Sequence, residues 1–175
     1  MNKHQVVIIN GNGGVGKDTF VNALKIVARH RMTIWNYSSV DKIKEIAKLI
    51  GWDGNKDEKG RKLLSDLKVL CDNYNNLTFE AMQSKVDEFK RSDASILFLH
   101  IREPHNIKAA KIAFDAETVL VTRDAVEQIT SNDSDKNVAE YDYDFIVNND
   151  GDISDLGDEC DRFLQYLDTI SAYTL

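Results

Sequence analysis

The 175-residue chain has little proline, little cysteine and no long hydrophobic run. Pro104 is its only proline, and its two cysteines, Cys71 and Cys160, lie in helical-looking segments without the spacing of metal ligands. Buried, reduced thiols are therefore expected, which suits a cytosolic compartment. No stretch approaches the roughly 18 apolar residues of a membrane span, and the residues before the first glycines lack the hydrophobic segment of a signal peptide. We therefore expect a cytoplasmic protein.

The chain also lacks an excess of basic residues. Its 22 Lys and Arg against 29 Asp and Glu give a formal net charge of −7. Nucleic acids and anionic membranes need a basic face, so neither is an expected partner, whereas a local positive site could still bind a small anion. A hydrophobic content of 42% and a charged content of 29% are typical of a globular protein, and the length fits one domain, monomeric or homodimeric.

Short apolar stretches alternate with helical patterns along the chain. Strands are predicted at 4–10, 32–37, 94–101, 117–123 and 144–149. Helices are predicted at 17–30, from an N-cap at Ser38 or Ser39 to about 50, in two parts over 58–92, at about 105–115 and along the C-terminal segment. This alternation predicts an α/β fold with a parallel, five-stranded sheet covered on both faces.

The stretch GNGGVGKDT, residues 11–19, follows a β-branched strand and opens a helix. A tight turn alone would need only one or two glycines, but this loop has four and ends in Lys17. Glycines let a backbone wrap a phosphate, the N–H groups of a helix start point at it, and the lysine reaches the β- and γ-phosphates. The predicted nucleotide-binding residues are Gly11, Asn12, Gly13, Gly14, Val15, Gly16, Lys17, Asp18 and Thr19.

Asp18 stands where this motif usually has Ser or Thr. A carboxylate is a hard oxygen donor that could hold Mg²⁺, and Thr19 is predicted to help hold the metal or to bond a phosphate. The alternative is that Asp18 is a first-turn residue favoured by the helix dipole. Both interpretations can be true together.

Two arginines follow predicted strands. Arg102 and Arg123 end the third and fourth strands, so both are expected near Gly11 at the edge of a parallel sheet where ligands bind. A charge at the end of a buried strand is costly unless it meets an anion, such as a phosphate, or an acid, such as Glu103 or Asp124. His100, alternating with apolar residues, is more simply a satisfied crevice histidine than a catalyst.

The acceptor side of the site is harder to predict. Arg61 opens a helix in DEKGRKLLSDLK (57–68), where a solvated helix face is the simpler explanation. Ser38 and Asp41 could line an acceptor pocket within residues 38–93, although capping or packing explains them equally well. We take Arg61, Ser38 and Asp41, together with Arg102, as candidate substrate-binding residues.

With these motifs in place, the chain resembles the P-loop nucleoside-monophosphate kinases, and among them the deoxynucleoside-monophosphate kinases of phages and bacteria. The similar segments cover nearly the whole chain in order: GKDT (16–19), RKLLSDLK (61–68), LFLHIREPHNIKAAK (97–111), VLVTRD (119–124) and AEYDYDFIVNNDGDISDL (139–156). The resemblance implies a three-layer α/β/α P-loop fold over residues 1–175, with a helical acceptor-binding region at 38–93 and a lid-like segment at 124–141.

The resemblance also implies ATP- and Mg²⁺-dependent phosphoryl transfer to a small phosphorylated acceptor, a (deoxy)nucleoside monophosphate. Lys17, Arg102 and Arg123 would be catalytic, with Arg123 stabilising charge on the transferring group, and Arg61 and Arg102 would hold the acceptor phosphate. Such reactions depend mostly on positioning and cationic stabilisation.

Two features depart from the family's pattern. His100 stands where an acidic residue that helps organise Mg²⁺ is expected. The segment 124–141 has Lys136 as its only basic residue, against the acids Asp124, Glu127, Asp133, Asp135 and Glu140. A non-catalytic nucleotide-binding or regulatory protein, or a kinase of another phosphorylated metabolite such as a phosphomevalonate kinase, therefore remains an alternative. A switch-type NTPase is disfavoured because no N-K-x-D motif is found.

Overall fold

The computed structural model describes residues 4–29, 31–126, 138 and 141–173. The strands are β1 (Gln5–Asn10), β2 (Ile34–Ser38), β3 (Ile96–His100), β4 (Glu117–Thr122) and β5 (Phe145–Asn148). The helices are α1 (Lys17–Val27), α2 (Asp41–Leu49), α3 (Glu58–Asn75), α4 (Leu77–Lys90), α5 (Pro104–Phe114) and α7 (Ile153–Tyr173). Among the described residues, no helix combines the length and apolar composition that a membrane crossing needs.

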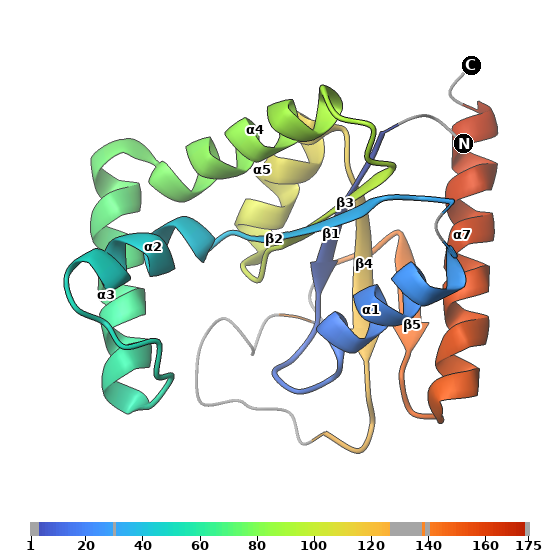
Figure 1. The fold of residues 1–175 in the computed structure, drawn as a ribbon, viewed down its shortest axis with the longest axis horizontal. Coiled ribbons are helices and arrows are strands. Elements are labelled where there is room, and N and C mark those ends of the chain that lie inside the picture. Colours follow the sequence, from blue (N-terminus) through green and yellow to red (C-terminus); the bar gives the residue numbers. More distant parts are fainter. Residues whose placement is uncertain (1–3, 30, 127–137, 139–140, 174–175) are drawn as a thin grey trace.

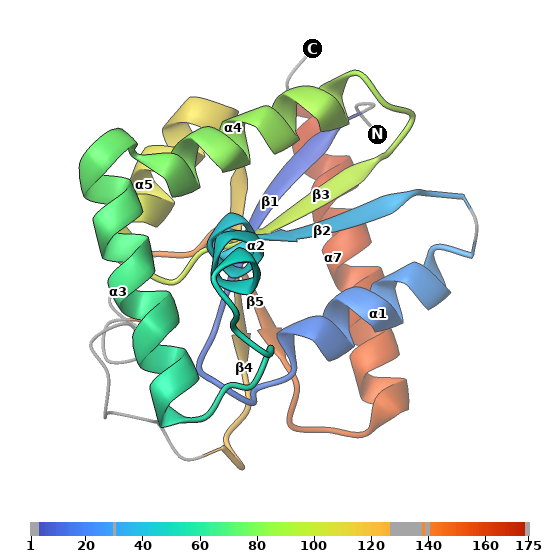
Figure 2. The same ribbon diagram turned by 60° about the vertical axis from the view of Figure 1, so that its left-hand side comes forward.

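The five strands form one parallel sheet in the order β2-β3-β1-β4-β5. Helices α1 and α7 cover one face of this sheet, and α4 and α5 cover the other (Figures 1 and 2). The predicted three-layer α/β/α architecture with a five-stranded parallel sheet is therefore confirmed. Strands buried on both faces become short, continuous apolar runs, which is why the sequence reveals them.

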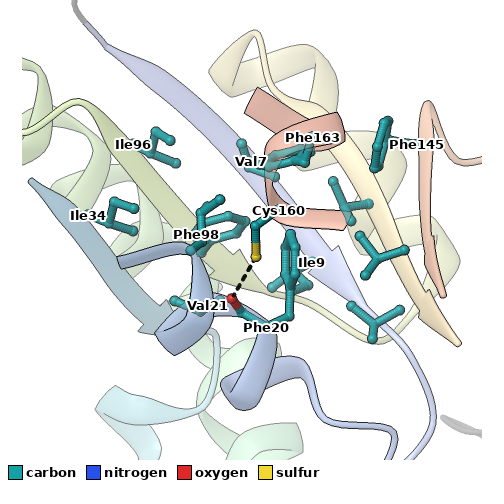
Figure 3. Close-up of a cluster of buried hydrophobic side chains, with 14 of the residues drawn as sticks. Val7, Ile9, Phe20, Val21, Ile34, Ile96, Phe98, Phe145, Cys160 and Phe163 are labelled. Atoms are coloured by element: carbon teal, nitrogen blue, oxygen red, sulfur yellow. Dashed lines mark hydrogen bonds between the residues drawn. The ribbon is translucent and has the colours of Figure 1, made fainter. Parts of the chain in front are cut away.

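Alternate residues of β1 face opposite layers of the core. Val7 and Ile9 pack with α1 and α7, whereas Val6 and Ile8 pack with α4 and α5. On the first face, Phe20 of α1 and Phe163 of α7 meet edge to face, with ring centroids 5.6 Å apart (Figure 3). These rings fix the start of α1, and hence the end of the preceding loop, against the sheet.

Both cysteines are free thiols, as expected, but only Cys160 is buried as predicted. Cys160 is buried in the same cluster as Phe20, and its Sγ lies 3.9 Å from the Phe20 carbonyl oxygen (Figure 3). Burial raises the pKa of the Cys160 thiol to about 12, so the group is a protonated part of the core. Cys71 is half-buried on α3.

The chain diverges at the carboxyl ends of β1 and β3. From β1 the chain passes through α1 to β2, on one side, whereas from β3 it passes through α5 to β4, on the other. Two adjacent parallel strands whose connections leave in opposite directions open a crevice between them, and ligands of open α/β sheets bind there. The glycine loop after β1 and Arg102 after β3 both stand at this position.

Helices α2 and α3, together with the start of α4, form a helical arm beyond β2, and the rest of α4 runs back over the sheet (Figure 1). The predicted break near 73–76 occurs at Asn76, whose left-handed φ of 55° ends α3 and precedes α4. The predicted cap of α2 is wrong. Its N-cap is Val40, because Ser38 is still paired with His100 in the sheet.

Candidate functional site

The glycine loop joins β1 to α1 through three glycines with positive φ. These are Gly11, Gly14 and Gly16, with φ of 147°, 86° and 93°. A Cβ on Gly11 would lie 2.4 Å from the Val121 carbonyl oxygen of β4, and one on Gly16 would lie 2.3 Å from Asn149 Nδ2. At both positions the close neighbour and the positive φ disfavour any residue other than glycine. The loop is therefore held tightly against β4 and the end of β5.

Lys17 lies across this loop at the first position of α1. Its Nζ donates to the carbonyl oxygens of Gly11, at 2.5 Å, and Asn12, at 2.9 Å. Because α1 begins here, the N–H groups of its first turn have no partners within the helix, and the positive end of the helix dipole faces the loop. An ammonium group, the backbone N–H groups of a helix start and a wrapped backbone are the chemistry of a phosphate site.

Asn149 supports the loop from the end of β5. Its side chain is almost fully buried, and its Nδ2 donates to the Val15 carbonyl oxygen at 2.7 Å. Its backbone N–H donates to Thr122 at the end of β4. Asn149 falls within the segment 139–156 that resembles the kinase family, but the sequence predicts no role for it. The available signal was a polar residue at the end of a buried strand.

Asp18 and His100 face each other beside the loop. The Asp18 side chain is 81% exposed on the first turn of α1, with one carboxylate oxygen 3.8 Å from His100 Nε2. The same Nε2 lies 2.6 Å from Asn36 Oδ1 on β2. Burial and the nearby Lys17 lower the pKa of His100, against the opposing effect of Asp18, so the imidazole is neutral at pH 7.

Few side chains at this site could bind a metal ion. In the part of the chain that the structure describes, no group of three or more His, Cys, Asp or Glu could hold a metal ion. Asp18 offers an exposed carboxylate, and Thr19 is exposed on the same first turn. This fits Mg²⁺, which is commonly bound by one or two carboxylates together with substrate phosphates rather than by a protein cage.

The structure brings Arg102 and Arg123 to the same edge of the sheet as the loop. Both are exposed, Arg102 two residues after β3 and Arg123 directly after β4. Arg61 is in the first turn of α3, where its Nε donates to the Lys56 carbonyl oxygen at 2.8 Å. Most of the lid-like segment 124–141 falls outside the described residues.

A cavity of about 300 Å³ lies between the helical arm and the start of α5. Its walls include Ser39, Lys68, Asp72, Thr78, Ile101 and Asn106. The ammonium group of Lys68 is 3.6 Å from Asp72 and 3.5 Å from Glu103, which directly follows Arg102. Asp72 also accepts hydrogen bonds from the backbone N–H of Thr78, at 2.9 Å, and from its hydroxyl, at 3.0 Å. A cavity with charged, polar and apolar walls is therefore lined by Ile101, the residue directly before the arginine at the switch point.

Sequence reasoning did not identify the cavity residues. Ser38 and Asp41, the predicted candidates, are not in its walls. Asp41 accepts a hydrogen bond from the Ser38 backbone N–H at 2.8 Å and contacts Lys44 at 2.7 Å, so the pair braces the turn after β2. Lys68 and Asp72 carried one signal, an opposite-charge pair four residues apart on a helix, which usually marks an exposed face.

Comparisons with known proteins bear on the fold. No protein-family model matches the sequence, and a search of curated proteins finds no match. Among solved structures, TT1252 from Thermus thermophilus is 18% identical with a TM-score of 0.54, over 95% of this chain and 99% of that one. Shikimate kinase from Aquifex aeolicus is 12% identical with a TM-score of 0.46, over 96% and 99%. The similarity to TT1252 supports a shared fold.

Proposed function

We propose that the protein is an ATP- and Mg²⁺-dependent kinase that transfers a phosphoryl group to a small phosphorylated acceptor, a (deoxy)nucleoside monophosphate. One observation carries the proposal: at the switch point of the sheet, Asn10, directly before the glycine loop, is hydrogen-bonded to the backbone oxygen of Arg102, and the preceding residue, Ile101, lines the cavity. The γ-phosphate of a nucleoside triphosphate on the loop and the phosphate of an acceptor in the cavity would meet at Arg102. In-line phosphoryl transfer requires this kind of juxtaposition.

On the donor side, residues 11–19 bind the phosphates of ATP. Lys17 exchanges its bonds to the Gly11 and Asn12 carbonyl oxygens for bonds to phosphate oxygens. Asp18 and Thr19 hold Mg²⁺, which when bound supplies charge neutralisation on the phosphates. Arg123 stabilises the charge that develops on the transferring group.

On the acceptor side, Arg102 and Arg61 hold the phosphate of the acceptor, and its organic part occupies the cavity. For Arg61 this requires release from the Lys56 carbonyl oxygen. Ser38 and Asp41 act by bracing the turn that carries Ser39, which is a wall residue. The cavity combines one carboxylate, a lysine and amides, which suits a ligand with both hydrogen-bond donors and acceptors, as nucleobases have.

A second candidate is a protein that binds ATP without turning it over. It is favoured by His100, a neutral group beside Asp18 where a second carboxylate would strengthen a cation site. The two candidates differ in product formation and not in nucleotide binding.

The test is a panel of nucleoside and deoxynucleoside monophosphates with ATP and Mg²⁺, following ADP release and the phosphorylated product by phosphorus NMR. We expect turnover with at least one acceptor, and Lys17→Ala should lower it by about 100-fold or more. Lys25→Ala, at an exposed position near the end of α1, is the matched control and should leave the rate unchanged. Folded protein that binds ATP but gives no product with any acceptor would refute the kinase proposal and favour the second candidate.

A further inference from the structure

Asn10 joins three distant parts of the chain. It is the last residue of β1, directly before Gly11, and its side chain is fully buried. Its Nδ2 donates to the Arg102 backbone oxygen at 3.1 Å and to the Tyr143 hydroxyl at 2.7 Å. One amide therefore connects the start of the glycine loop, the segment after β3 and the residues that lead into β5.

The Arg102 carbonyl fixes the orientation of this amide. A carbonyl oxygen can only accept, so Asn10 must turn Nδ2 towards it, and the Tyr143 hydroxyl beside the same nitrogen acts as a second acceptor. Asn10 Oδ1 is buried, with no hydrogen-bond partner in the described structure. A buried, unpaired oxygen lowers stability, and an apolar residue would continue the Val6–Ile9 run without that loss. The position therefore keeps an amide because of the bonds that Nδ2 makes.

The amide acts where the sheet no longer holds its strands together. The Ile101 N–H donates to the Ile9 carbonyl oxygen at 3.4 Å, and beyond this point the chains separate towards the glycine loop and Arg102. The bond from Asn10 to Arg102 crosses this gap. The Tyr143 ring is itself fixed, since it meets Tyr141 edge to face at 5.0 Å and packs against the cluster of β1, β3, α4 and α5.

We propose that Tyr143 is a positioning residue, whose hydroxyl acts through Asn10 to fix the start of the glycine loop relative to Arg102. The inference rests on the proposed function in that the loop binds ATP and Arg102 contacts the transferred or the acceptor phosphate. Without the hydroxyl, the Asn10 amide loses one of its two acceptors, and the loop and Arg102 shift relative to each other. Phosphoryl transfer is sensitive to such small displacements.

The test compares Tyr143→Phe with Tyr166→Phe. Both changes remove one hydrogen-bonded hydroxyl and keep the ring, and the Tyr166 hydroxyl of α7 donates to Glu117, the first residue of β4, at the end of the strand away from the glycine loop. We expect Tyr143→Phe to weaken ATP binding, measured by calorimetry, by about 3- to 10-fold, which corresponds to one hydrogen bond. Its kcat should fall by about 10-fold while the KM for the acceptor stays within about twofold. Tyr166→Phe should match the wild type in all three measurements.

A double-mutant cycle with Asn10→Ser separates positioning from general packing. Since the hydroxyl acts through Asn10, the double variant should bind ATP no more weakly than Asn10→Ser alone. Two results would overturn the proposal: effects of the two substitutions that multiply, or equal ATP affinities for Tyr143→Phe and Tyr166→Phe. If Asn10→Ser does not fold, the comparison of Tyr143→Phe with Tyr166→Phe decides. If the wild type binds ATP without transferring phosphate, the kinase proposal fails while the affinities still test Tyr143. If it binds no ATP, both proposals are wrong.

Discussion

The side-chain amide of Asn149 donates a hydrogen bond of 2.7 Å to the carbonyl oxygen of Val15, in the middle of the glycine loop. The Asn149 backbone is bonded in turn to Thr122 of β4. The loop is thus supported by β4 and by the residue that follows β5, on the side of the sheet away from the helical arm. Its shape before any ligand binds follows from these contacts as well as from its glycines.

We expect Asn149→Ala to lower the free energy of unfolding by about 1–3 kcal/mol, because the change leaves the Val15 carbonyl oxygen unpaired at a buried site. ATP binding should weaken with it, since the loop loses its support. Urea unfolding and calorimetry measure the two effects. Asn22→Ala, at an exposed position of α1, is the control and should change stability by less than about 0.5 kcal/mol. Equal stabilities for the two variants would contradict this role of Asn149.

Two glycine substitutions should have opposite effects. Gly16→Ala places a Cβ 2.3 Å from Asn149 Nδ2 at a φ of 93°, so we expect a loss of about 1–3 kcal/mol and at least about 10-fold weaker ATP binding. Gly157→Ala lies within α7 with nothing within 4 Å, and should raise stability by about 0.5–1 kcal/mol. Thermal and urea unfolding of both proteins are the measurements. A Gly16→Ala protein with wild-type ATP affinity would show that the loop adjusts freely.

The sequence predicts the sheet and the glycine loop because both depend on local patterns. The β-branched run before Gly11 and the glycine spacing are visible within 15 residues. The contact between Asn149 and Val15 is not, because it joins residues 134 positions apart and depends on β4 lying between β1 and β5. Asn10 and Tyr143 were missed for the same reason. The roles of the loop residues and of the arginines stay predictions.

The helical arm shows a different limit. Ser38 or Ser39 was predicted as the cap of α2 because serine favours caps, but Val40 holds that position, and the pairing of Ser38 with His100 keeps it in β2. Lys68 and Asp72 have the spacing of an ordinary exposed pair, and only the packing of α3 beside Glu103 makes them cavity residues. Tertiary contacts decide both cases, and they leave little trace in the local sequence.

His100 should titrate below its ordinary pKa of 6.5 in metal-free protein, because burial disfavours the imidazolium. Between the folded and unfolded pKa values the unfolded chain binds more protons, so this histidine lowers stability as the pH falls below 6.5. Nitrogen NMR of the imidazole should show a proton on Nε2, which faces Asn36 Oδ1 at 2.6 Å. The His100→Asn variant should lose less stability than the wild type as the pH falls below 6.5. A titration midpoint at or above 6.5 would contradict the expectation.

Asp144 ties the residues before β5 to β4 and α5. Burial alone would raise its pKa, but hydrogen bonds from Lys111 and from the Thr118 hydroxyl and N–H outweigh this and lower the pKa below 3.8. The ionised carboxylate therefore stabilises the fold above pH 3.8, and this contribution is lost as the pH falls through the folded pKa.

Thr118→Val should remove the hydroxyl from this arrangement, where it donates to Asp144 at 2.7 Å and accepts from the Asp144 N–H at 3.0 Å. Thr118 is fully buried and valine has nearly the same shape, so the change isolates the hydrogen bonds. We expect a loss of about 1.5–3 kcal/mol at pH 7. The loss should shrink towards pH 3, because protonation of Asp144 weakens the same bonds in the wild type.

The matched control is Thr169→Val, because the exposed Thr169 hydroxyl donates to the Gln165 carbonyl oxygen. This variant should change stability by less than about 0.5 kcal/mol. Urea unfolding at both pH values decides, and a loss independent of pH would mean that the Thr118 hydroxyl does not act through the Asp144 carboxylate.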